Sequence, residues 1–84
     1  MSRVEKLKRR LEKVPKDFTY EEAKRLLRHY GFVEDNKGMT SGSRVIFIRK
    51  LDGKRIMLHK PHPGNIMKHY AVKKLKEFLS KVGD

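Results

Sequence analysis

The sequence contains no cysteine and no tryptophan, only three prolines, and fewer than half as many acidic as basic residues. Without cysteine there is neither a disulfide framework nor a cysteine-ligated zinc site, so the composition fits a reducing cytoplasm. No apolar stretch approaches the length of a membrane span, and the charged amino terminus lacks the apolar run of a signal peptide. We therefore expect a cytoplasmic protein that does not insert into a membrane.

What is present is positive charge on a short chain. The 84 residues allow one small core and exclude a multidomain enzyme. Twenty-two Lys and Arg against 10 Asp and Glu give a net charge of +12. Residues 44–84 carry 11 basic and 3 acidic side chains, which places +8 of that charge in the second half. A field of this sign concentrates polyanions, so nucleic acid is the leading partner class.

Three stretches have helical periodicity. Apolar residues at 3-4-3 spacing predict a helix over residues 2–14, which Pro15 ends, and we treat residues 1–15 as an extension of a domain spanning 16–84. Thr19 and Glu22 form a capping-box pattern that starts a second helix over 20–30. A third amphipathic helix is predicted over 66–82.

Three short β-branched and aromatic runs predict strands over 32–34, 45–48 and 55–59. Asp52-Gly53 between the last two predicts an antiparallel hairpin in which both turn residues have positive φ. So small a sheet needs one apolar face covered, and the helices over 20–30 and 66–82 can cover it. The expected fold is therefore α+β, with helices on one sheet face; alternation leaves open which face of strand 45–48 is buried.

His59 and His62 are the leading candidates for proton transfer, because they bracket Lys60 and Pro61 at the end of the third strand. Imidazole and ammonium groups there can bind a phosphate and move a proton. The alternative is that both are ordinary polar residues at a strand end.

Metal chemistry is not expected. The sequence has no cysteine, and Asp52 is the only acidic residue between Asp35 and Glu77. We predict no metal site and no cofactor.

The residues Gly31-Phe32, Gly42-Ser43 before a strand containing Phe47, and His62-Pro63-Gly64 before the last helix resemble the HicA family of mRNA interferase toxins. The resemblance runs from about residue 18 to 79. It implies a double-stranded-RNA-binding-like fold and a ribonuclease that a HicB-type antitoxin covers. The helix before Pro15 is additional to the usual pattern.

The resemblance also implies that the family's catalytic histidine follows Gly-Ser, and here that position is Arg44. Arginine stays protonated and cannot act as a base, but it can stabilise charge on a pentavalent phosphate. We therefore predict an mRNA-binding, metal-independent endoribonuclease. Its catalytic candidates are Arg44, His59 and His62, and its RNA contacts are Ser43, Arg44, Arg49, Lys50, Lys60 and Lys68.

Three alternatives stay open. The domain can bind RNA without cutting it, or its basic surface can serve only to bind an acidic protein such as the antitoxin. A role at a membrane surface ranks last, since the stripe over 2–14 is narrow and has only Val and Leu.

Overall fold

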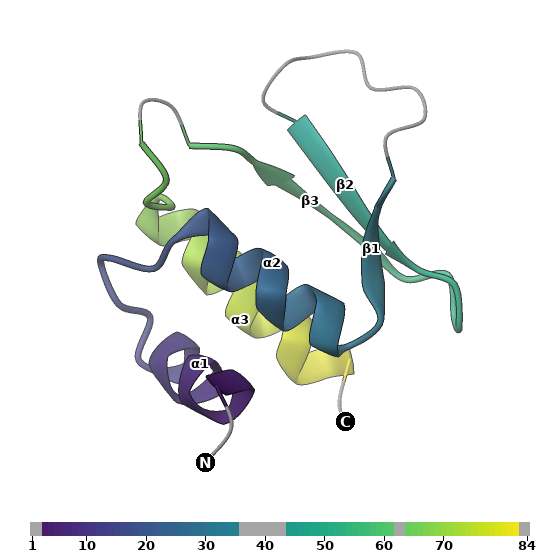
Figure 1. The fold of residues 1–84 in the computed structure, drawn as a ribbon, viewed down its shortest axis with the longest axis horizontal. Coiled ribbons are helices and arrows are strands. Elements are labelled where there is room, and N and C mark those ends of the chain that lie inside the picture. Colours follow the sequence, from purple (N-terminus) through teal and green to yellow (C-terminus); the bar gives the residue numbers. More distant parts are fainter. Residues whose placement is uncertain (1–2, 36–43, 62–63, 83–84) are drawn as a thin grey trace.

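The amphipathic stretches fold as helices and the β-branched runs as strands. The structure is a computed structural model that describes residues 3–35, 44–61 and 64–82 (Figure 1). The elements follow one another as α1 (Arg3–Glu12), α2 (Tyr20–His29), β1 (Phe32–Asp35), β2 (Arg44–Arg49), β3 (Arg55–His59) and α3 (His69–Val82). The strands form one antiparallel sheet in the order β1-β2-β3, which confirms the α+β architecture.

The core lies between one face of the sheet and the helices α2 and α3. Val45 and Phe47 of β2 are buried, whereas Ile46 and Ile48 are only half-buried. Of the two faces that the sequence left open for β2, the one that carries Val45 and Phe47 therefore faces the core. The register then shows which residues of β1 and β3 lie on the core face and which on the outer face, because directly paired residues share a face. The principal buried side chains of the sheet and the two helices are Ala23, Leu26, Leu27, Phe32, Val45, Phe47, Ile56, Leu58, Val72, Leu75 and Leu79.

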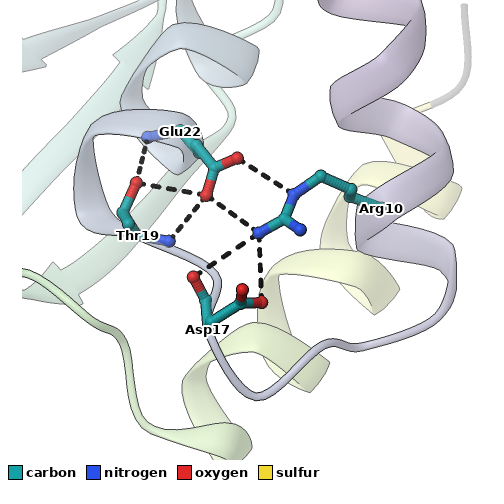
Figure 2. A network of polar contacts seen from close by, with 4 residues as sticks. All are labelled: Arg10, Asp17, Thr19 and Glu22. Carbon is teal, nitrogen blue, oxygen red and sulfur yellow. Dashed lines mark hydrogen bonds and ion pairs between the residues drawn. The ribbon is translucent and has the colours of Figure 1, made fainter.

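Helix α2 begins at the predicted capping box. Thr19 Oγ1 accepts from the Glu22 backbone N–H at 3.1 Å, and Glu22 Oε1 accepts from the Thr19 backbone N–H at 2.9 Å. The reciprocal bonds satisfy two backbone donors that the first turn of a helix leaves without partners. Figure 2 shows that Arg10 of α1 reaches the same Glu22 carboxylate.

Helix α1 packs onto the rest of the domain rather than projecting from it. Leu7 and Leu11 are buried in the common core, and Figure 1 shows α2 and α3 lying between α1 and the sheet. Lys76 Nζ of α3 donates to the Glu12 backbone carbonyl at 2.9 Å and so caps the last turn of α1. The division into residues 1–15 and 16–84 remains a prediction, but α1 shares the core of the domain.

Two helix boundaries differ from the sequence expectations by two or more residues. Helix α1 ends at Glu12, because Val14, which precedes Pro15, has a φ of +46° and leaves the helical conformation. Helix α3 begins at His69 rather than 66, because Ile66 pairs with Thr19 in an isolated bridge and the Met67 backbone N–H donates to the Phe18 carbonyl.

The hairpin is present, but the prediction of positive φ at both Asp52 and Gly53 was wrong. Among the described turn residues only Gly53 has positive φ, at +72°. The Gly53 N–H donates to the Arg49 carbonyl and the Arg49 N–H donates to the Lys54 carbonyl, both at 2.8 Å. These bonds close a four-residue turn, which needs only one left-handed residue.

Candidate nucleic-acid interface

The face of the sheet opposite the helices carries two of the candidate residues as a directly opposed pair. Arg44, the first residue of β2, pairs with His59, the last residue of β3. Both side chains are exposed. Position 44, to which the family resemblance assigned a catalytic imidazole, therefore lies beside a histidine of the neighbouring strand.

The alternation of an antiparallel ladder brings these two side chains close. At the hairpin the Arg49 N–H donates to the Lys54 carbonyl, as at a hydrogen-bonded position of the ladder, and the register from Ile48 and Arg55 to Arg44 and His59 has no bulge. Hydrogen-bonded and non-hydrogen-bonded pairs alternate along an antiparallel ladder. The Arg44–His59 pair is five positions from Arg49 and Lys54, an odd number, so it is a non-hydrogen-bonded pair. At such positions the Cα atoms are about 4.5 Å apart and the side chains lie closest.

The guanidinium and the imidazole are available for a ligand. Within residues 3–35, 44–61 and 64–82, no hydrogen bond or ion pair engages the side chain of Arg44 or of His59. Exposed Lys60 follows His59 directly, and exposed Lys68 directly precedes α3. Ser43 and His62 lie outside the described residues.

Arg49 lies at the other end of β2 and is held by the protein itself. Its Nη2 donates to Asp52 Oδ2 at 2.6 Å, its Nη1 donates to the Tyr30 carbonyl at 3.2 Å, and its Cζ lies 5.2 Å from the centroid of the Phe32 ring. The hydrogen bond from Arg49, with a second from the Lys54 backbone, lowers the pKa of Asp52 to about 2. Arg49 therefore has a structural role that the charge pattern did not reveal.

The structure thus divides the predicted RNA contacts on and beside the β2–β3 hairpin into two groups. Arg44 and Lys60 lie at one end of the β2–β3 hairpin, together with His59. Arg49 and the exposed turn residue Lys50 lie at the other end, roughly 16 Å away along a strand of this length.

Between the two ends the outer face is mostly apolar, with Asp35 of β1 opposite Ile46, and it bears no helix among the described elements. Val33 of β1 is 47% exposed, and Ile46, Ile48 and Met57 are half-buried. The register places these four on the same side of the sheet as Arg44. The face is therefore accessible to a bound molecule.

One contact beside this face is not visible in the sequence. Lys74 Nζ of α3 donates to the Met57 carbonyl at 3.3 Å, on the free edge of β3. The spacing of four residues between Tyr70 and Lys74 indicates a shared helix face. The contact of Lys74 with a strand edge has no signal in the sequence.

Among the described residues, no three His, Cys, Asp or Glu side chains gather where they could hold a metal ion. The same part of the chain has no helix of the length and apolarity that crossing a membrane requires.

The fold and the exposed sheet face define a small basic α+β domain of the double-stranded-RNA-binding-like type. A family model described as the HicA toxin of bacterial toxin-antitoxin systems matches residues 20–83. The chain belongs to this family, and membership implies an antitoxin partner. A search of curated proteins and a search of solved structures each gave no match. Helix α1 lies outside the matched residues.

Proposed function

We propose that this toxin binds mRNA and cleaves it as a metal-independent endoribonuclease, at the end of the sheet where Arg44 faces His59. The supporting observation is this cross-strand pair: a proton acceptor and a fixed positive charge lie side by side, exposed, with no protein partner among the described residues. A ribonuclease without metal needs both functions.

In the proposed reaction, neutral His59 takes the proton from a ribose 2′-hydroxyl. The 2′-oxygen attacks the adjacent phosphorus, the bond from phosphorus to the 5′-oxygen breaks, and that oxygen leaves with a proton from solvent or a second acid. The products are a 2′,3′-cyclic phosphate and a 5′-hydroxyl end. Arg44 stabilises the charge of the pentavalent phosphate, because a guanidinium offers two parallel N–H donors to phosphate oxygens.

The register supports the proposed exchange of roles between positions 44 and 59. The resemblance puts the family's histidine at position 44, and the residue closest to that point on the neighbouring strand is His59. An imidazole can reach the same surface from either strand. His62 remains the second candidate for a proton-transfer role.

The proposed RNA contacts also include Ser43, Lys60 and Lys68. Lys50 is proposed to contact only longer RNA molecules. We leave Arg49 out, because Asp52, the Tyr30 carbonyl and the Phe32 ring already engage its guanidinium. The proposed antitoxin is of the HicB type, and the proposed location is the cytoplasm, where mRNA is found.

The test is an RNA cleavage assay with purified protein in the presence of EDTA, which also tests independence from metal. His59→Ala should lower the cleavage rate about 10²- to 10⁴-fold, the range of general acid-base catalysis. Arg44→Gln should lower it with the base still present. His29→Ala is the matched control, because His29 is exposed at the end of α2, which leads into β1, the edge strand opposite β3. Full activity of a His59→Ala, His62→Ala double variant contradicts the mechanism.

A second candidate function is RNA binding without cleavage. The observation that favours it is Arg44 itself, a residue with permanent charge where the resemblance expects a base. Wild-type protein that binds RNA tightly and leaves it intact would establish this function instead.

A further inference from the structure

One aromatic ring stands apart from the core. Six of the seven Phe and Tyr rings of the described residues are buried or half-buried, whereas Tyr70, in the first turn of α3, is 62% exposed. No aromatic contact or cation–π contact within the described residues engages the Tyr70 ring, whereas Tyr30 lies beneath Lys8 and Phe78 packs on Phe32. The ring of Tyr70 thus has an open face.

The Lys74 contact locates Tyr70 relative to the candidate site. Lys74 Nζ of α3 donates to the Met57 carbonyl of β3, so the two elements lie side by side at that point. Figure 1 shows that α3 runs in the direction opposite to β3. Moving four residues toward the N-terminus of α3 therefore follows the same direction in space as moving two residues toward the C-terminus of β3.

Those two steps have nearly the same length. Four helical residues rise about 6 Å and two strand residues about 6.6 Å. The first step leads from Lys74 to Tyr70 and the second from Met57 to His59. Tyr70 therefore lies toward the His59 end of the β3 edge, on the helix face that it shares with Lys74.

The charge around Tyr70 has one sign. Lys68 precedes it by two residues, Lys73 and Lys74 follow one turn later, and all three are exposed. The first turn of α3 contains no acidic residue. An aromatic ring within a row of cations is the arrangement with which proteins bind single-stranded nucleic acid, where cations follow the phosphates and the ring stacks on a base.

We propose that Tyr70 stacks on an unpaired base next to the phosphate held at Arg44 and His59, and thereby makes this site select single-stranded over duplex RNA. The inference rests on the proposed function, since it assumes that RNA passes over the edge of β3. In a duplex each base is covered on both faces by its neighbours, so only an unpaired base can stack on the Tyr70 ring.

The experiment measures binding of a short unstructured RNA and of a duplex with the same sequence. Both probes carry 2′-O-methyl groups, which remove the attacking hydroxyl and prevent cleavage. Tyr70→Ala should weaken binding of the single strand roughly 5- to 150-fold, the effect of one lost stacking contact, and should leave duplex binding within about twofold. Tyr70→Phe keeps the ring and should bind like the wild type.

Leu51→Ala is the matched control, because Leu51 is 86% exposed in the hairpin turn, at the other end of β2 and β3. Circular dichroism of each variant checks that α3 still forms, and Ala at position 70 favours a helix. A 2-aminopurine base in the single strand adds a direct readout, since stacking quenches its fluorescence with the wild type and with Tyr70→Phe but not with Tyr70→Ala.

The outcomes separate this inference from the proposed function. Equal single-strand affinity of wild type and Tyr70→Ala overturns stacking and leaves RNA binding and cleavage in place. Selective loss in Tyr70→Ala, together with intact cleavage by His59→Ala, supports stacking and overturns the catalytic role of His59. Wild-type protein that binds neither probe overturns both proposals.

Discussion

Arg10 of α1 forms a two-pronged contact with Glu22 of α2: Nε lies 3.0 Å from Oε2 and Nη2 lies 3.2 Å from Oε1 (Figure 2). Glu22 Oε1 also closes the capping box on Thr19, and Arg10 Nη2 reaches Asp17 Oδ1 at 3.2 Å. The helix that lies outside the family match is thus joined to the residues that start the matched domain.

Arg10→Ala should lower the free energy of unfolding by about 1 kcal/mol, because a bidentate pair exceeds an ordinary surface pair although partial exposure screens it. Urea denaturation measures the change. Glu22→Gln should cost less than Glu22→Ala, since a Gln can still accept from the Thr19 N–H. Lys6→Ala, on an exposed position of α1, is the control and should change little. Equal stability of Arg10→Ala and the wild type would mean that the contact contributes nothing.

Leu11→Ala should be more damaging than the loss of Arg10. Leu11 is buried in the common core, and truncating a buried Leu costs about 2–5 kcal/mol. Val4→Ala, at a half-buried position of the same helix, should cost less. The same denaturation experiment ranks the three variants. If Leu11→Ala leaves the unfolding midpoint unchanged, α1 is not docked in solution, and residues 1–15 are a separate extension as the sequence suggested.

The sequence predicted what depends on neighbouring residues and missed what depends on register. Thr19 and Glu22 are three apart, so their capping box could be recognised directly, and the elements had recognisable periodicities. The meeting of Arg44 with His59 depends on the length of the turn between β2 and β3, which short-range patterns do not specify within one residue. Arg49 and Lys50 appear equivalent as neighbouring cations, yet only Arg49 faces the helices, where Asp52 and the Tyr30 carbonyl engage it.

The hairpin should lose stability in acid through one ion pair. The pKa of Asp52 is lowered to about 2 by the hydrogen bond from Arg49, so the folded state holds the charged form more strongly than the unfolded chain does. The contribution is complete above the unfolded value near 3.8 and is lost as the pH falls toward 2.

Asp52→Asn should therefore be less stable than the wild type at neutral pH, and the difference should shrink between pH 5 and 2. Thermal melting across that range measures it. Arg49→Gln should likewise reduce the loss of stability between pH 5 and 2, and the Arg49→Gln, Asp52→Asn double variant should show no further reduction. A difference between wild type and Asp52→Asn that stays constant down to pH 2 would contradict the pairing.

Tyr20 gives the opposite pH dependence. Its hydroxyl is buried without a hydrogen-bond partner in the described structure. Burial, with the charges of Glu34 and Glu21, raises its pKa to about 12. Stability from this group is complete below pH 10 and is lost as the pH rises toward 12.

Tyr20→Phe should stabilise the protein by about 1 kcal/mol, because it removes an unsatisfied polar group and keeps the ring that packs near Phe47. It should also reduce the loss of stability between pH 10 and 12. Tyr70→Phe, which removes an exposed hydroxyl, is the control and should be neutral. Lower stability of Tyr20→Phe at pH 7 would show that the hydroxyl has a partner in solution.

The last prediction concerns the salt dependence of RNA binding. Each phosphate that a Lys or Arg neutralises releases counterions, so the logarithm of the affinity falls with the logarithm of the salt concentration by about 0.7 per contact for a single strand. Arg44→Gln, Lys60→Gln and Lys68→Gln should each reduce that slope by about 0.7, measured between 50 and 200 mM salt with the uncleavable single strand. Lys13→Gln, after the end of α1, should leave the slope unchanged. Lys50→Gln reports whether the strand extends to the hairpin turn: a reduced slope with long RNA alone is expected, because the turn lies far from the Arg44–His59 pair. An affinity that does not change between the two salt concentrations would show that phosphate contacts do not hold the RNA, and the basic surface would then be left to the antitoxin.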